Sequence, residues 1–169
     1  MQQPWSRGSR GLPVVAAALL VAAGSSSTSG AAARTVPRPT GQQAAHCRAL
    51  HAELPTTLAG LERGTPRPVS EFTAAWGHPA VLLRCGIPRP EVLTVGSKSF
   101  DRYAPVWETG GVKWFVEQPP GGGVRCIADH RAAFVEVFVP KEYGGDGTGQ
   151  ALLDELTAVI GATIPEGYV

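Results

Sequence analysis

The strongest constraint on the fold is the alternation of apolar and polar residues between residues 112 and 139. Val112, Trp114 and Val116 occupy alternate positions, which place them on one face of a strand. The turn-forming run Pro119–Gly123 interrupts the pattern, so the chain reverses there. Antiparallel pairing of neighbouring strands is therefore predicted. The strands expected in this region are 112–117, Val124–Asp129 and Ala133–Val139.

Two helices and a hairpin are predicted outside this region. Apolar residues recur at helical spacing in two segments, and two β-prone segments flank a Gly-His-Pro turn. Together these features favour an α+β fold, a small two-layer domain whose mostly antiparallel sheet packs against an N-terminal and a C-terminal helix. Between them, Glu91–Gly111 is expected to be a long excursion with a strand or turn near Val92–Val95. The other predicted elements are a helix at Ala44–Leu54, strands at Thr73–Trp76 and Ala80–Cys85, and a helix from Gln150 to about Ile160 with Thr148 as its cap.

The N-terminal segment has the layout of a secretory signal. Arg7 and Arg10 precede the uncharged apolar run Leu12–Ala23, which is too short to be a typical membrane span, and small residues follow it. Cleavage after Gly24 or after Ala33 fits, and so does an uncleaved anchor. We expect residues 1–33 to be a signal peptide or membrane anchor, 34–43 a flexible linker, and 44–169 a single extracytoplasmic α+β domain, either secreted or tethered to the cytoplasmic membrane.

The charge balance argues against a nucleic-acid partner. Removing residues 1–33 takes away Arg7 and Arg10 and no acidic residue, which leaves 13 Lys and Arg against 14 Asp and Glu, a net charge of −1. No basic block remains to neutralise phosphates. A membrane is expected as a partner only through the N-terminal segment, if that segment is retained.

Three cysteines in an exported chain predict one disulfide and one remaining thiol. A bond between Cys47 and Cys85 is favoured, because a helix end packed on a strand end brings these two residues within reach. Pairing of Cys85 with Cys126 is the alternative. The remaining thiol is expected to be buried as a small apolar group.

The motifs associated with cofactors and catalysis are incomplete. Cys47 and His51 are four residues apart on the predicted helix, but no other histidine has the spacing of a zinc ligand. The glycine-rich segment Gly144–Gly149 lacks the Lys-Ser/Thr ending of a phosphate-binding loop. We therefore predict no metal and no cofactor and assign no catalytic residue; a protein without enzymatic activity is favoured, and an enzyme stays open as the alternative.

The candidates for an exposed aromatic platform are three tryptophans, Trp76, Trp107 and Trp114. Trp114 alternates with valines and is predicted to lie in the core. Trp76 precedes a turn and is the better surface candidate, although tryptophan is usually largely buried. The resulting candidate recognition site is the turn formed by Trp76, Gly77, His78 and Pro79.

Several segments resemble a family known as domain of unknown function 3515. They are Cys47–Leu61, Ala75–Pro90, Gly111–Trp114 and Ala133–Pro140, followed by a final helix. The resemblance covers about residues 44 to 164. It implies an envelope-associated actinobacterial protein with an N-terminal hydrophobic segment, and it supplies no catalytic residues.

The expected function is therefore a non-catalytic binding or interaction module of the cell envelope. Its expected partner is an envelope protein or a cell-wall component. The alternative is an envelope hydrolase or metal-dependent enzyme whose site the sequence does not reveal, and a third possibility is a purely structural tethered protein.

Overall fold

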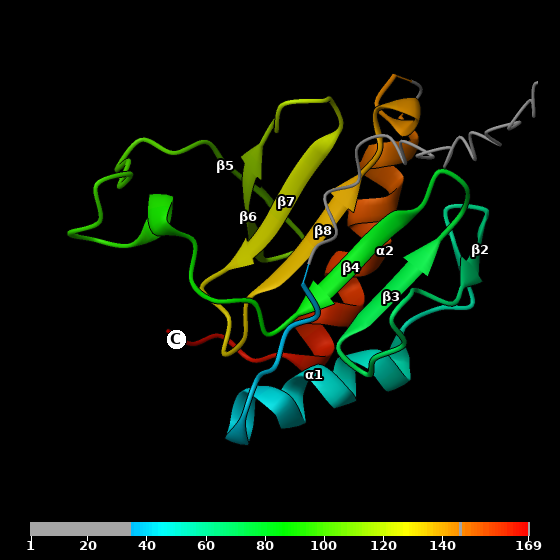
Figure 1. Ribbon diagram of the computed structural model, residues 1–169, viewed down its shortest axis with the longest axis horizontal. Coiled ribbons are helices and arrows are strands. Elements are labelled where there is room, and N and C mark those ends of the chain that lie inside the picture. The colour runs from blue at the N-terminus through cyan, green and yellow to red at the C-terminus, as the bar shows by residue number, and fades with distance from the viewer. Residues whose placement is uncertain (1–34, 146, 169) are drawn as a thin grey trace, which may run out of the picture. The chain divides into compact units, whose positions relative to one another are not determined.

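The computed structural model describes residues 35–145 and 147–168, so the predicted signal segment at 1–33 lies outside the described residues. In the sequence, helix α1 precedes the strands and helix α2 follows them, and the strands form one sheet (Figure 1). Two short 3-10 helices, η1 and η2, lie in connecting segments. In chain order the elements are α1 (Gly41–Glu53), β1 (Thr57–Leu58), β2 (Leu61–Gly64), β3 (Thr73–Trp76), β4 (Val81–Cys85), η1 (Glu91–Leu93), β5 (Val106–Thr109), β6 (Val112–Glu117), β7 (Val124–Asp129), β8 (Val135–Val139), η2 (Lys141–Tyr143) and α2 (Thr148–Thr163).

The strands of the described residues form an eight-stranded sheet in the order β1-β2-β3-β4-β8-β7-β6-β5. Each neighbouring pair is antiparallel, including the central pair β4 and β8, which are far apart in the sequence. The segment between these two strands contains β5, β6 and β7, so the sheet continues to one side of β8. The predicted two-layer α+β class is confirmed.

One face of the sheet forms the main core with both helices. Cys47 and Leu50 of α1 and Leu152, Leu156 and Ile160 of α2 are fully buried in a single cluster with strand residues. The strand residues in this cluster occupy alternate positions, as the period of a strand requires. We call this helix-covered side the inner face; its strand members include Ala74, Trp76, Val81, Leu83, Cys85, Val112, Trp114, Cys126, Ala128, Val135, Val137 and Val139.

The ends of both helices differ from the prediction. α1 begins at Gly41, three residues earlier than predicted and inside the segment expected to be a linker. α2 begins at Thr148, so Thr148 is its first residue and not its cap; Gly147 precedes it with a φ of 82°, and no side chain caps the helix. A glycine reaches this left-handed conformation without steric cost, and this freedom, not a threonine cap, sets the start of α2.

The buried helix residue Thr157 pairs with a core tryptophan. The Trp114 Nε1–H donates a hydrogen bond to the Thr157 hydroxyl oxygen at 3.0 Å, and both side chains are buried. A buried indole N–H needs such an acceptor, because it is cut off from water. The pair therefore fixes how α2 sits on β6.

Replacing Thr157 with valine keeps the shape of the side chain and leaves the indole N–H without its acceptor. We expect Thr157→Val to lower the free energy of unfolding by about 1–3 kcal/mol, measured by urea denaturation. Thr56→Val is the matched control, because Thr56 is exposed. Equal stability of the two variants would contradict this role of the hydroxyl.

Candidate functional site

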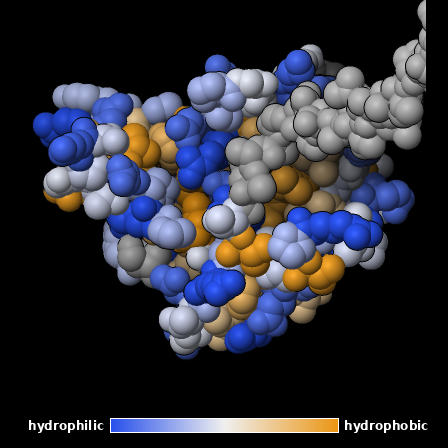
Figure 2. Space-filling view, in the orientation of Figure 1, coloured by the Kyte–Doolittle hydropathy of each residue, from blue (hydrophilic) through white to orange (hydrophobic). Residues whose placement is uncertain are grey.

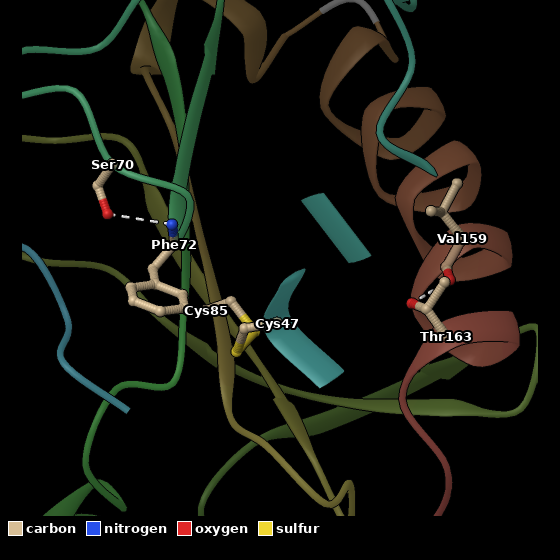
Figure 3. Close-up of a disulfide and its surroundings, with 6 residues drawn as sticks. All are labelled: Cys47, Ser70, Phe72, Cys85, Val159 and Thr163. Carbon is tan, nitrogen blue, oxygen red and sulfur yellow. Dashed lines mark hydrogen bonds between the residues drawn. A yellow bond between two sulfur atoms is a disulfide. The ribbon is translucent and has the colours of Figure 1, made fainter. Parts of the chain in front are cut away.

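The predicted disulfide joins α1 to the end of β4. Cys47 and Cys85 are bonded with their Cα atoms 5.5 Å apart, and both are fully buried (Figure 3). The backbone N–H of Cys85 also donates to the Phe72 carbonyl at 2.9 Å, so the strand end is held on two sides. The favoured pairing is confirmed, and Cys47 is not available to a metal ion.

Loss of the disulfide should be measurable as loss of stability. The bond closes a loop with a sequence separation of 38 residues, for which the chain-entropy model gives about 4 kcal/mol. We expect the Cys47→Ala, Cys85→Ala double variant to lose about this much free energy of unfolding in urea denaturation. Cys126→Ala, which removes a cysteine without removing a crosslink, is the control and should lose much less.

The third cysteine is buried and unsuited to nucleophilic chemistry. Cys126 is free, lies on the inner face, and is 1% exposed. Burial raises the pKa of its thiol to about 12. A nucleophilic cysteine requires the thiolate, so the predicted role of this residue as a small apolar group is confirmed.

The raised pKa of Cys126 predicts a loss of stability in alkaline solution. The folded state keeps its proton up to about pH 12, whereas the ordinary thiol pKa is 9.0. The thiol's contribution is therefore fully present below pH 9.0 and is lost as the pH rises toward 12, by at most about 1.4 kcal/mol per pH unit. Denaturation of the protein and of Cys126→Ala across this range should show their stability difference changing with pH; a constant difference would contradict the prediction.

The predicted recognition turn is exposed only in part, and the prediction that Trp76 lies at the surface is wrong. The Trp76 side chain is fully buried on the inner face, its Nε1–H donates to the Pro55 carbonyl at 3.0 Å, and the Arg63 guanidinium lies 5.9 Å from the ring centre. The face of the strand, and not proximity to a turn, determines its burial. Ala74 and Trp76 alternate toward the helices, and Trp76 pairs with the inner-face residue Val81.

The rest of this turn is at the surface. His78 and Pro79 are exposed and Gly77 is half-buried. The Tyr143 hydroxyl donates to the Pro79 carbonyl at 2.9 Å, which attaches the turn to η2. A Cβ at Gly77, whose φ is 73°, would lie 2.9 Å from that hydroxyl oxygen. These contacts account for the glycine as a packing requirement.

Large exposed apolar side chains gather instead in the excursion between η1 and β5. Of the seven found among the described residues, five lie between residues 95 and 107: Val95, Phe100, Tyr103, Val106 and Trp107. We call these five residues the apolar loop cluster. Tyr103 is 82% exposed and Trp107 is 39% exposed. The excursion projects from the sheet at the left of Figure 1, and Figure 2 shows orange residues among blue ones on the same part of the surface.

Hydrogen bonds give this excursion a defined conformation. The Thr94 hydroxyl donates to the Pro90 carbonyl at 2.8 Å, and the Ser97 hydroxyl donates to the Glu91 carbonyl at 2.7 Å. The Asp101 N–H donates to the Val92 carbonyl at 3.0 Å.

The inward-facing side chains of the excursion complete a second, smaller core on the other face of the sheet. That core contains Ile87, Phe115, Ile127 and Phe134, with Val92, Leu93 and Ala104 packed against it.

The apolar loop cluster continues into an edge strand. β5 is the last strand in the sheet order, and its Val106 and Trp107 are exposed. An edge strand presents backbone donors and acceptors that a further strand can pair with. Trp107 is thus the tryptophan that lies at the surface. The sequence signal for it is the Gly110-Gly111 pair before β6, which indicates a hairpin and therefore a strand, β5, that contains Trp107 and pairs with β6.

Ion pairs lie in the middle of the sheet face that is opposite the inner face. Glu136 is 2% exposed, and its two carboxylate oxygens accept from Arg84 at 3.1 Å and from Arg125 at 2.7 Å. Arg125 also pairs with Glu117 at 2.6 Å. Burial lowers the pKa of Arg125, but hydrogen bonds and charges of Glu136 and Glu117 outweigh it and raise the pKa overall. These groups neutralise one another, so we assign them a structural role.

A polar cavity of about 240 Å³ lies where the C-terminal segment meets the end of β7. The Nδ1 of His130 is 3.0 Å from Oδ2 of Asp129, and the Arg131 guanidinium binds the Gly111 and Ile164 carbonyls. None of the described residues that line the cavity is a serine, threonine or cysteine. The histidine and carboxylate are thus present without a serine, threonine or cysteine beside them, although Lys113 and Tyr168 line the same cavity.

Cys47 and His51 do not form a zinc site in the structure, because Cys47 is bonded to Cys85. Nε2 of His51 lies 3.2 Å from the Arg63 guanidinium, and burial, together with this positive charge, lowers the pKa of His51. Within residues 35–145 and 147–168, no group of three or more potential metal-ligating side chains occurs. The described part of the chain likewise contains no helix long and apolar enough to cross a membrane.

Fold and surface together define a small two-layer α+β domain with a buried disulfide and an ordered, projecting apolar loop. A family model described as "Protein of unknown function (DUF3515)" matches residues 11–169, so the chain belongs to this family. Neither a curated protein nor a solved structure matches the chain.

Proposed function

We propose that this protein is a non-catalytic cell-envelope module, exported or tethered by its N-terminal segment, that binds a protein partner through the apolar loop cluster. The observation that carries the proposal is the concentration of exposed apolar side chains between residues 95 and 107. Ordinary surfaces expose such side chains singly, whereas clusters of them mark interaction sites.

The extracytoplasmic location rests on two independent features. The sequence places Arg7 and Arg10 before the apolar run Leu12–Ala23, which is the layout of an export signal. The disulfide between Cys47 and Cys85 is a bond that persists in oxidising compartments. Both features support a protein that works outside the cytoplasm.

A protein partner suits the chemistry of the loop better than a cell-wall polymer. Val95, Val106 and Phe100 are aliphatic or purely aromatic groups, which gain by burial against other apolar side chains. Tyr103 and Trp107 add the large rings that dominate the energetics of protein interfaces. The outer edge of β5, the last strand of the sheet formed by the described residues, offers backbone hydrogen bonds to a partner strand in the same place.

Site-specific photocrosslinking in the native host tests the location of the interface. A photoreactive phenylalanine analogue replaces Tyr103 in one strain and Tyr168 in another; Tyr168 is a matched control because it is 81% exposed against 82% for Tyr103 and lies outside the loop. We expect a discrete crosslinked protein from position 103 that is absent at position 168. The same product from both positions, or none from position 103, would overturn the proposal.

The partner identified by crosslinking is then purified and titrated with the full chain. We expect Tyr103→Ala to weaken binding at least about tenfold, because truncating an aromatic hot spot in an interface costs about 2 kcal/mol or more, and tenfold corresponds to about 1.4 kcal/mol. Tyr168→Ala should bind like the unchanged protein. Unchanged affinity of Tyr103→Ala would place the interface elsewhere.

A further inference from the structure

An apolar cavity of about 270 Å³ opens on the inner face of the sheet, beside the start of α2. Its walls include Trp107, Val116, Val124, Cys126, Val139 and Leu153. None of the described residues that line it carries a charge. Its polar side chain, Gln150, is exposed and donates to Asp154 at 2.8 Å.

The cavity exists because α2 covers only part of the inner face. Along β6, Val112 and Trp114 are fully buried beneath the helix, whereas Val116, the next residue on the same face, is only half-buried. Along β7, Cys126 is buried and Val124 is half-buried. Past the N-terminal start of α2, Val116 and Val124 therefore continue the apolar face with no helix of the described residues above them.

Glycines keep the mouth of the cavity open. Gly144, Gly147 and Gly149 line it and have no side chains to fill it. Gly149 packs closely against η2, where a Cβ would lie 3.0 Å from the Tyr143 carbonyl oxygen. This requirement explains a glycine at position 149 in packing terms, and the small rim that results gives access to the apolar floor.

The size and chemistry of the cavity select one kind of ligand. An apolar cavity of about 150 Å³ admits benzene, with its six carbon atoms. By the same ratio, this cavity holds a hydrocarbon group of roughly ten carbon atoms. The described lining is apolar apart from Gln150 and carries no charge, so it suits the hydrocarbon part of a ligand, and we place the polar head group at the mouth, near the exposed Trp107 ring.

We propose that the cavity beside the start of α2 binds a single hydrocarbon chain of an amphiphile and leaves its polar head in solvent. Binding is driven by the removal of apolar surface from water on both sides. The site shares Trp107 with the apolar loop cluster but does not include Tyr103, and it does not depend on the function proposed above.

Binding of decanoate to the full chain, below the concentration at which decanoate forms micelles, tests this assignment. We expect saturable shifts in the methyl NMR signals of Val116, Val124, Val139 and Leu153, and saturable heat in calorimetric titration. Butanoate has the same head group with a shorter chain and should bind at least tenfold more weakly. Equal binding of butanoate, or no saturable shift with decanoate, would overturn the proposal.

A second experiment fills the cavity with a larger side chain. Val124→Trp places a large ring in the cavity and should weaken decanoate binding at least tenfold. Val69→Trp is the matched control, because Val69 is 76% exposed and is not among the residues lining the cavity. Val116→Trp replaces Val124→Trp if thermal melting shows that the latter is unfolded. Unchanged decanoate binding in a folded filled variant would overturn the proposal, whereas crosslinking from Tyr103 should persist in it.

Discussion

The structure depends on the removal of one apolar face of the sheet from water. The alternate strand residues that form this face bury a continuous surface only when both helices cover it, and the disulfide between Cys47 and Cys85 fixes α1 against the central strand β4. On α2, the hydroxyl of Thr157 accepts from Trp114 and sets the second helix in place. The positions of the remaining elements follow from this layer.

The other face is covered in a different way. No α-helix of the described residues lies on it; instead, the excursion after β4, which contains the 3-10 helix η1, packs against Phe115 and Ile127, and Glu136 pairs with two guanidinium groups. Buried ion pairs of this kind stabilise little relative to apolar packing, but losing one partner is costly. The excursion thus contributes to the fold by its inward side and has its outward side available for binding.

Both proposed binding sites lie where the packing of helices and strands over apolar side chains is incomplete. The apolar loop cluster lies in the excursion and on the edge strand β5, and the apolar cavity lies beside the start of α2. Trp107 borders both, since it is exposed at the edge and lines the cavity. The stable layer therefore fixes two adjacent surfaces that differ in their chemistry, one suited to a protein and one to a hydrocarbon chain.

The sequence by itself determined the strands of the central sheet, the two helices and the α+β class, because strand alternation and helical spacing are local patterns. It favoured the disulfide between Cys47 and Cys85 and left pairing of Cys85 with Cys126 open, because that bond joins residues far apart in the sequence. It misplaced the surface tryptophan and missed β1, β2 and β5. Whether Trp76 or Trp107 is exposed depends on which face the helices cover and which strand lies at the edge. Only the tertiary structure decides these, because burial is a property of what packs against a residue.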